Sequence, residues 1–171
     1  QLTQSSETEK DLNNKIKEMT TIQINQLEEQ KNVGLFGKKE GSVYFSQKTT
    51  PLSNNEVRID ISLSGEKTTS VDAADLVLSY SPTLVITEIK KGSAFPSYPR
   101  SLGQNGIITI TGIALPQGNT VTYGKTGEIF ATVILKKQGR GTVEIITKDT
   151  QAYFNGTSIL DLTNSFKPIE L

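Results

Sequence analysis

The residues of this 171-residue chain that could do chemistry are carboxylates, serines, lysines and tyrosines, because it contains neither cysteine nor histidine. A thiolate nucleophile, a Ser-His-Asp triad, a disulfide and the usual zinc ligands are therefore excluded. The sequence also lacks the alternating carboxylates of a calcium-binding loop. We predict no catalytic residue, no metal site and no cofactor, and hence a protein that is not an enzyme.

Paired carboxylates are the remaining route to catalysis, since two of them at a suitable separation can hydrolyse glycosides. Asp72 with Asp75, or Asp149 with Asp161, could form such a pair. Nothing in the sequence fixes the distance between them. Solvated carboxylates on strand faces or in turns are the simpler interpretation, and they are the one we expect.

Residues 71–92 show the clearest alternation of apolar and polar residues, which is typical of a strand with one buried face. The face predicted to enter the core comprises Ala74, Leu76, Leu78 and Tyr80. The opposite, solvent-facing side comprises Ala73, Asp75, Val77 and Ser79. Pro82 then interrupts the strand because proline has no amide hydrogen for the ladder, and a second strand follows.

The same two-residue period continues to the end of the chain and predicts about nine short strands. Besides the two in 71–92, they are expected at 42–48, 55–64, 107–113, near Val121, and at 128–137, 142–148, 151–154 and 158–163. Residues 96–106 are interpreted as a loop because they contain Pro96 and Pro99. Many short strands without a helix-length pattern between them indicate an antiparallel β-sandwich.

Four segments of this region resemble motifs of the cohesin family. One runs from Tyr80 through the turn Ser81-Pro82 to Leu84, Gly92, Ser93 and Phe95. The others are the predicted strands that begin at Gly106 (GIITI), Gly127 (GEIFATV) and Gly141 (GTVEI). Cohesins are β-sandwich modules of bacterial cell-surface scaffolds that bind dockerin modules on partner proteins. The resemblance extends over residues 41–171 and implies an all-β, antiparallel jelly-roll sandwich, an architecture shared with carbohydrate-binding modules.

The resemblance also implies a face that binds a protein partner. In cohesins an acidic residue on the strand before the Tyr-x-Pro turn contacts the partner, and Asp75 stands at that position. The candidate partner-binding residues are Ala73, Asp75, Val77 and Leu115. Ala73 replaces an amide side chain and Leu115 a carboxylate of the best-known dockerin-binding cohesins, so the partner could be a dockerin-like module or another surface protein. A plain solvated aspartate is the alternative for Asp75.

Residues 1–40 differ in composition from the rest of the chain and contain no glycine or proline before Gly34. Apolar residues near helical spacing predict one amphipathic helix, and they are Leu12, Ile16, Met19, Ile22 and Leu27. We expect two parts, a helix with its connector at 1–40 and the sandwich at 41–171. Packing on the sandwich, a stalk, self-association through residues 8–31 and disorder all stay open for the helix, and a membrane-surface role stays open for the connector.

The charge balance and the N-terminal sequence bear on the expected partners and location. Lysine plus arginine equals aspartate plus glutamate at 18 each, so no overall field favours nucleic acid. The sequence shows no signal peptide, and we expect an extracellular or cell-surface protein whose anchoring segment lies upstream of Gln1. The main prediction is a non-enzymatic protein-interaction module.

Two other functions stay open. A polysaccharide could bind to Tyr98 and Tyr123, which are expected to lie in loops and to be exposed. Alternatively, the chain could be a subunit of a surface filament or pilus that assembles through residues 8–31.

Overall fold

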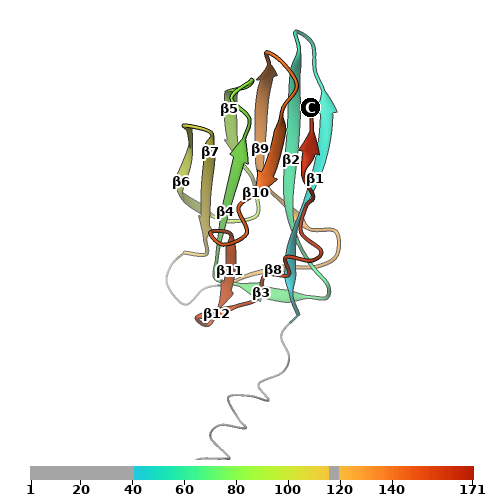
Figure 1. Cartoon of the computed structure of the whole chain (residues 1–171). Helices are drawn as coiled ribbons and strands as arrows, with labels where there is room; N and C mark the ends of the chain where they lie inside the picture. The colour runs from blue at the N-terminus through green and yellow to red at the C-terminus, as the bar shows by residue number, and fades with distance from the viewer. Residues whose placement is uncertain (1–40, 116–119) are drawn as a thin grey trace, which may run out of the picture. The chain divides into compact units, whose positions relative to one another are not determined.

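Two antiparallel sheets form most of the structure, a computed structural model that describes residues 41–115 and 120–171 (Figure 1). Within these residues the regular structure consists of strands, and no α-helix is present. No helix there is long and apolar enough to cross a membrane. The predicted helix at 8–31 and the whole predicted N-terminal part at 1–40 lie outside the described residues.

The smaller main sheet has four strands in the order β1-β2-β9-β5. Their bounds are β1 Val43–Pro51, β2 Glu56–Gly65, β9 Glu128–Lys137 and β5 Leu84–Lys91. All neighbours in this sheet are antiparallel. Strand β2 follows the predicted alternation, with Val57, Ile59, Ile61 and Leu63 turned into the core.

The larger sheet has seven strands arranged around β4 (Ala73–Tyr80). On one side of β4 lies β7 (Ile107–Ile113), followed by the edge strand β6 (Ser97–Gln104). The other side is shared by β11 (Gln151–Phe154) and β10 (Thr142–Ile145), which pair with different halves of β4. The two-residue strands β12 (Thr157–Ser158) and β13 (Ile169–Glu170) pair with β11 and β10 respectively.

A third, two-stranded sheet crosses the lower end of the sandwich in Figure 1. It consists of β3 (Thr69–Val71) and β8 (Val121–Tyr123). Tyr123 on β8 joins an aromatic cluster with Phe95, Tyr98, Phe130 and Phe45, whose rings meet edge to face. Edge-to-face aromatic pairs stabilise the folded state by more than their buried area accounts for. This cluster therefore fixes how the side chains pack at one end of the core.

The predicted buried face of β4 is confirmed for Ala74, Leu76 and Leu78, each with no exposed surface. Tyr80, at the end of the strand, is half-buried. Directly opposite these residues on β7 lie Gly112, Ile110 and Ile108. The two-residue period therefore identifies correctly which side of the central strand enters the core.

Two expectations about the strands need correction. The described residues contain thirteen strands and not about nine, because β3 and β13 are too short to leave a periodic pattern and β6 was not expected. The predicted loop at 96–106 contains strand β6. Pro99 is tolerated there because β6 is an edge strand and its pairing with β7 is irregular between Ser97 and Arg100.

Candidate functional site

The outer surface of the seven-stranded sheet carries the candidate partner-binding residues. We call the part formed by β4, β7 and β6 the β4 face. It comprises Ala73, Asp75, Val77 and Ser79 on β4, Ile107, Thr109, Thr111 and Ile113 on β7, and Arg100, Leu102 and Gln104 on β6. Residues that pair across antiparallel strands lie on the same side of a sheet, so register alone puts these side chains on one face.

Asp75 and Arg100 are the charged residues of the β4 face. Asp75 pairs with Thr111, which pairs in turn with Arg100, so the three lie in one row across β4, β7 and β6. The Thr111 hydroxyl donates to Asp75 Oδ1 at 2.6 Å. Among the described residues neither Asp75 nor Arg100 forms an ion pair. Both charges therefore remain available to a molecule that covers the face.

Apolar side chains occupy the neighbouring rows of the β4 face. Leu102 is 50% exposed and Ile107 is 37% exposed, and they lie in adjacent rows of the paired strands β6 and β7. Half-buried Ile113 and Ala73 extend the apolar surface toward the other end of the strands. The β4 face thus combines exposed aliphatic side chains with few charges, and a low content of charged residues is typical of protein interfaces.

Val77 lies on the predicted side of β4, but the expectation that it is solvent-facing is wrong, because only 9% of its surface is exposed. Thr109 lies directly across from it on β7. On the other side the segment between β10 and β11 runs beside it, where Ile146 donates its amide hydrogen to the Val77 carbonyl. Val77 can therefore contribute little contact area to a partner.

The other predicted contact residues occupy different places. Ala73 pairs with Ile113 on β7 and with Tyr153 on β11, so it lies in the middle of the sheet surface. Leu115 is 49% exposed but follows the end of β7, beyond the row of Ala73. The structure thus brings Ala73 and Asp75 together on one strand and leaves Leu115 at the margin.

Tyr98 and Tyr123 do not form an exposed sugar-binding surface, which overturns the expectation for both. They are 8% and 2% exposed and pack in the aromatic cluster. The Tyr123 hydroxyl donates to the carbonyl of Ala94. Burial raises the pKa of Tyr98 to about 12 and raises that of Tyr123 further. Their aromatic faces are thus used inside the protein, which removes the sequence basis for polysaccharide binding.

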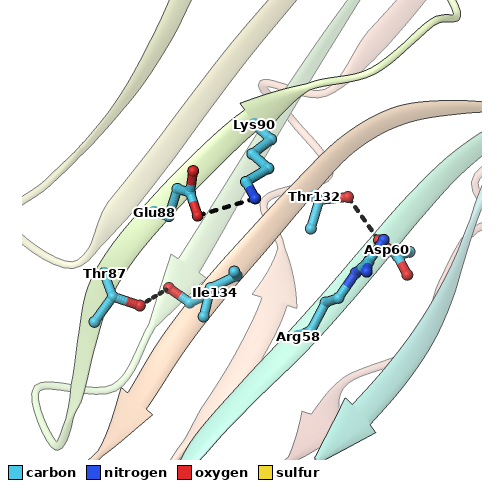
Figure 2. A network of polar contacts seen from close by, with 7 residues as sticks. All are labelled: Arg58, Asp60, Thr87, Glu88, Lys90, Thr132 and Ile134. Atoms are coloured by element: carbon cyan, nitrogen blue, oxygen red, sulfur yellow. Dashed lines mark hydrogen bonds and ion pairs between the residues drawn. The ribbon is translucent and has the colours of Figure 1, made fainter. Parts of the chain in front are cut away.

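The outer surface of the four-stranded sheet has a different character. We call it the charged face, and its central residues are Lys48, Arg58, Asp60, Glu88, Lys90, Thr132 and Ile134. Figure 2 shows Asp60 between Thr132 and Arg58, which donate to its Oδ1 at 2.6 and 2.8 Å. A second ion pair joins Lys90 and Glu88 at 3.2 Å. This surface is a network of alternating charges, which is typical of a solvated sheet face.

The pKa of Asp60 reflects the hydrogen bonds and positive charges around its carboxyl group. Partial burial by itself raises the pKa of the carboxyl group. The hydrogen bonds from Thr132 and Arg58, together with the positive charges of Arg58 and Lys48, outweigh that effect and hold the pKa below its ordinary value. The charged form is therefore stabilised within the molecule and has little need of an external partner.

Three of the four carboxylates considered for catalysis accept hydrogen bonds within the structure. Asp72 accepts the amide hydrogen of Asn155 at 2.6 Å, in the hairpin between β11 and β12. Asp161 accepts hydrogen bonds from Thr163 and Asn164, which lower its pKa. Asp75 is held by Thr111 as described above. In the described part of the chain, no group of three or more acidic residues is arranged to hold a metal ion.

Sequence reasoning missed the contribution of β6 to the candidate site. Arg100 and Leu102 lie in the segment interpreted as a loop, so they were not assigned to any face. The alternation of Arg100, Leu102 and Gln104 with smaller residues was the available signal, and Pro99 obscured it. Ile107 was assigned to a strand but its side chain points outward, since it pairs with Ser79 and not with Leu78.

Comparisons with known proteins agree with the sandwich architecture described above. By sequence, the chain matches no described protein family and no curated protein. By structure, it is similar to the seventh ScaB type I cohesin of Pseudobacteroides cellulosolvens, with a TM-score of 0.56 and 14% identity over 74% of this chain and 90% of that one.

Two further solved structures extend the comparison. One is a type I cohesin–dockerin complex, Coh-OlpA-Doc918, from Clostridium thermocellum, with a TM-score of 0.53 and 13% identity over 69% of this chain and 91% of the matched one. The other is a non-cellulosomal cohesin of Archaeoglobus fulgidus, with a TM-score of 0.51 and 13% identity over 68% of this chain and 83% of that one. The described domain therefore has a cohesin-like fold, as the sequence motifs predict.

Proposed function

We propose that this chain is a non-enzymatic interaction module that binds a dockerin-like protein partner on the β4 face. The supporting observation is the contrast between the two outer sheet surfaces. Both sheets expose aliphatic side chains, Leu102 and Ile107 on the β4 face and Val85 on the other sheet, but the β4 face also has two charges without ion-pair partners among the described residues. The charged face instead satisfies its central charges internally. Removal of exposed apolar surface from water favours association through the β4 face.

The cohesin-like fold makes a dockerin the first partner to test. The matched structure from Clostridium thermocellum is a cohesin–dockerin complex. Architecture alone does not determine function, so the proposal depends on the surface as well as on the fold. An extracellular or cell-surface location, in which such a module would join two proteins, is part of the same proposal.

A binding assay with matched variants tests the proposal. The chain is immobilised and a panel of purified dockerin modules is passed over it by biolayer interferometry. We expect saturable binding of at least one module. Leu102→Asp should weaken that binding at least about tenfold, because it replaces the most exposed aliphatic side chain of the β4 face with a charge.

Val85→Asp is the matched control. Val85 is 40% exposed and pairs with Lys136 on the other sheet. The Val85→Asp substitution therefore also places a carboxylate at an exposed aliphatic position. This variant should bind as the unmodified chain does. Equal weakening by both substitutions, or the failure of every dockerin to bind, would argue against the proposal.

A further inference from the structure

The β4 face has a charge pattern that is complementary to itself. Asp75, Thr111 and Arg100 form one row. The negative charge lies on β4 and the positive charge on β6, and β7 runs between these two strands. Neighbouring strands lie about 4.8 Å apart, so the backbones of Asp75 and Arg100 are about 10 Å apart and nearly equidistant from β7. Reversal of this row end for end therefore exchanges the positions of the two charges.

The apolar rows have the same property. In the next row Val77, which is nearly flush with the surface, and the protruding Leu102 lie on either side of Thr109. One row further, Ile107 lies on β7 itself between Ser79 and Gln104, and 37% of it is exposed. Reversal of these rows places Leu102 over the flat surface at Val77 and Ile107 over itself.

We infer that the β4 face binds the β4 face of a second copy of this chain, around a two-fold axis that runs along β7. Such an axis exchanges β4 with β6, so Asp75 lies opposite Arg100 of the second copy and the reverse pair forms by symmetry. A two-fold axis perpendicular to the strands would instead place Asp75 opposite itself, and like charges disfavour that arrangement. Two twisted sheets pack with their strands at about 30°, so the axis is inclined to β7 by about half that angle, and the long arginine side chain can reach across the resulting offset.

The contact is small, so the dimer should be weak and transient. The seven residues of β7 extend about 23 Å, and three to four strands are about 15 Å wide. A rectangle of that size is about 350 Å² per copy, less than half of the roughly 800 Å² that each partner of a standard specific interface contributes. Because the dimer covers the face assigned to the partner under the proposed function, self-association and partner binding would exclude each other. The test below uses no partner, so its failure is separate from failure of the proposed function.

Charge reversal in the full chain tests the inference by sedimentation equilibrium at low salt. Asp75→Arg and Arg100→Asp each convert two attractive pairs of the dimer into repulsive ones, and each should lower the association constant about tenfold or more. The double variant with both changes restores opposite charges and should return the constant to within about threefold of the original. Thermal unfolding of all variants verifies that the fold is intact.

Three outcomes would overturn the inference. The first is a chain that stays monomeric at the highest attainable concentration. The second is association that both single variants leave unchanged, which would place the contact elsewhere, as in self-association through residues 8–31. The third is a double variant that associates no better than the single ones.

Cross-linking gives an independent test of the axis, since the chain has no cysteine of its own. Thr109→Cys lies on the axis and should be joined to its own copy by a short bis-maleimide linker, because packed sheets are about 10 Å apart. A mixture of the Asp75→Cys and Arg100→Cys chains should cross-link more than either chain alone. Preferential linking of Asp75→Cys to itself would contradict the proposed axis.

Discussion

Thr150 completes the hydrogen bonding of Val77 where β4 passes the gap between β10 and β11. The Val77 amide donates to Thr150 Oγ1 at 3.0 Å, and the Thr150 hydroxyl lies 3.2 Å from the Val77 carbonyl, to which it donates. Thr150 has no exposed surface. The Thr150 side chain thus supplies the acceptor for the Val77 amide at a point where no strand neighbours it, while the Val77 carbonyl also accepts from the Ile146 amide.

Removal of that hydroxyl should be costly. Thr150→Val keeps the shape of the side chain but leaves the buried amide of Val77 without its acceptor, so we expect a loss of about 1–3 kcal/mol in the free energy of unfolding. Thr122→Val, at an exposed position of β8, is the control and should change stability by less than about 0.5 kcal/mol. Urea unfolding measures both, and equal effects would contradict the role assigned to Thr150.

Gly92 should not tolerate a side chain. A Cβ atom there would lie 1.8 Å from the carbonyl oxygen of Ile129, which belongs to the backbone and cannot rotate away. Gly92→Ala is therefore expected to destabilise the domain by about 1–3 kcal/mol or more, as overpacking does. Gly124→Ala is the matched control, because no atom lies within 4 Å of the added Cβ. The control should leave stability unchanged. Similar melting temperatures for the two variants would show that Gly92 does not pack closely against the backbone of β9.

Substitutions on the two sides of β4 should differ less than simple alternation predicts. Leu76→Ala removes a fully buried side chain and should cost about 2–5 kcal/mol. From the alternation alone, Val77→Ala is expected to cost under about 1 kcal/mol. Because Val77 is only 9% exposed, we now expect about 1–2 kcal/mol. Chemical denaturation of both variants checks this order, and a Val77→Ala loss as large as that of Leu76→Ala would contradict it.

Acid should remove the contribution of Asp60 to stability. The pKa of its carboxyl group lies below the ordinary value in the folded state, so folding favours the charged form. That contribution is complete above the unfolded-state pKa of about 4 and is lost as pH falls through the lower folded-state value. The difference in unfolding free energy between the unmodified chain and Asp60→Asn should therefore be largest above about pH 5 and should shrink below about pH 4. A difference that grows as pH falls would contradict the assigned direction.

Turn residues can also be read from the sequence. Asn155-Gly156 is a dipeptide typical of hairpins, and it joins β11 to β12 with positive φ angles of 49° and 74°. Asn105-Gly106 between β6 and β7 adopts the same conformation, with φ angles of 54° and 77°. The second was missed because it lay in the segment assigned to a loop. Both dipeptides suit such turns because asparagine and glycine tolerate positive φ.

The strand periodicity, the buried side of β4 and the resemblance to cohesins can all be read from the amino-acid sequence, because a two-residue period and turn residues are local properties of the chain. Which strands are neighbours follows from the folded arrangement alone. Strands β4 and β5 are consecutive, yet they belong to different sheets on either side of Pro82. The burial of Tyr98, Tyr123 and Val77, and the row that joins Asp75 to Arg100, likewise depend on residues distant in sequence. Side-chain exposure and charge pairing are set by those neighbours, which no local pattern specifies.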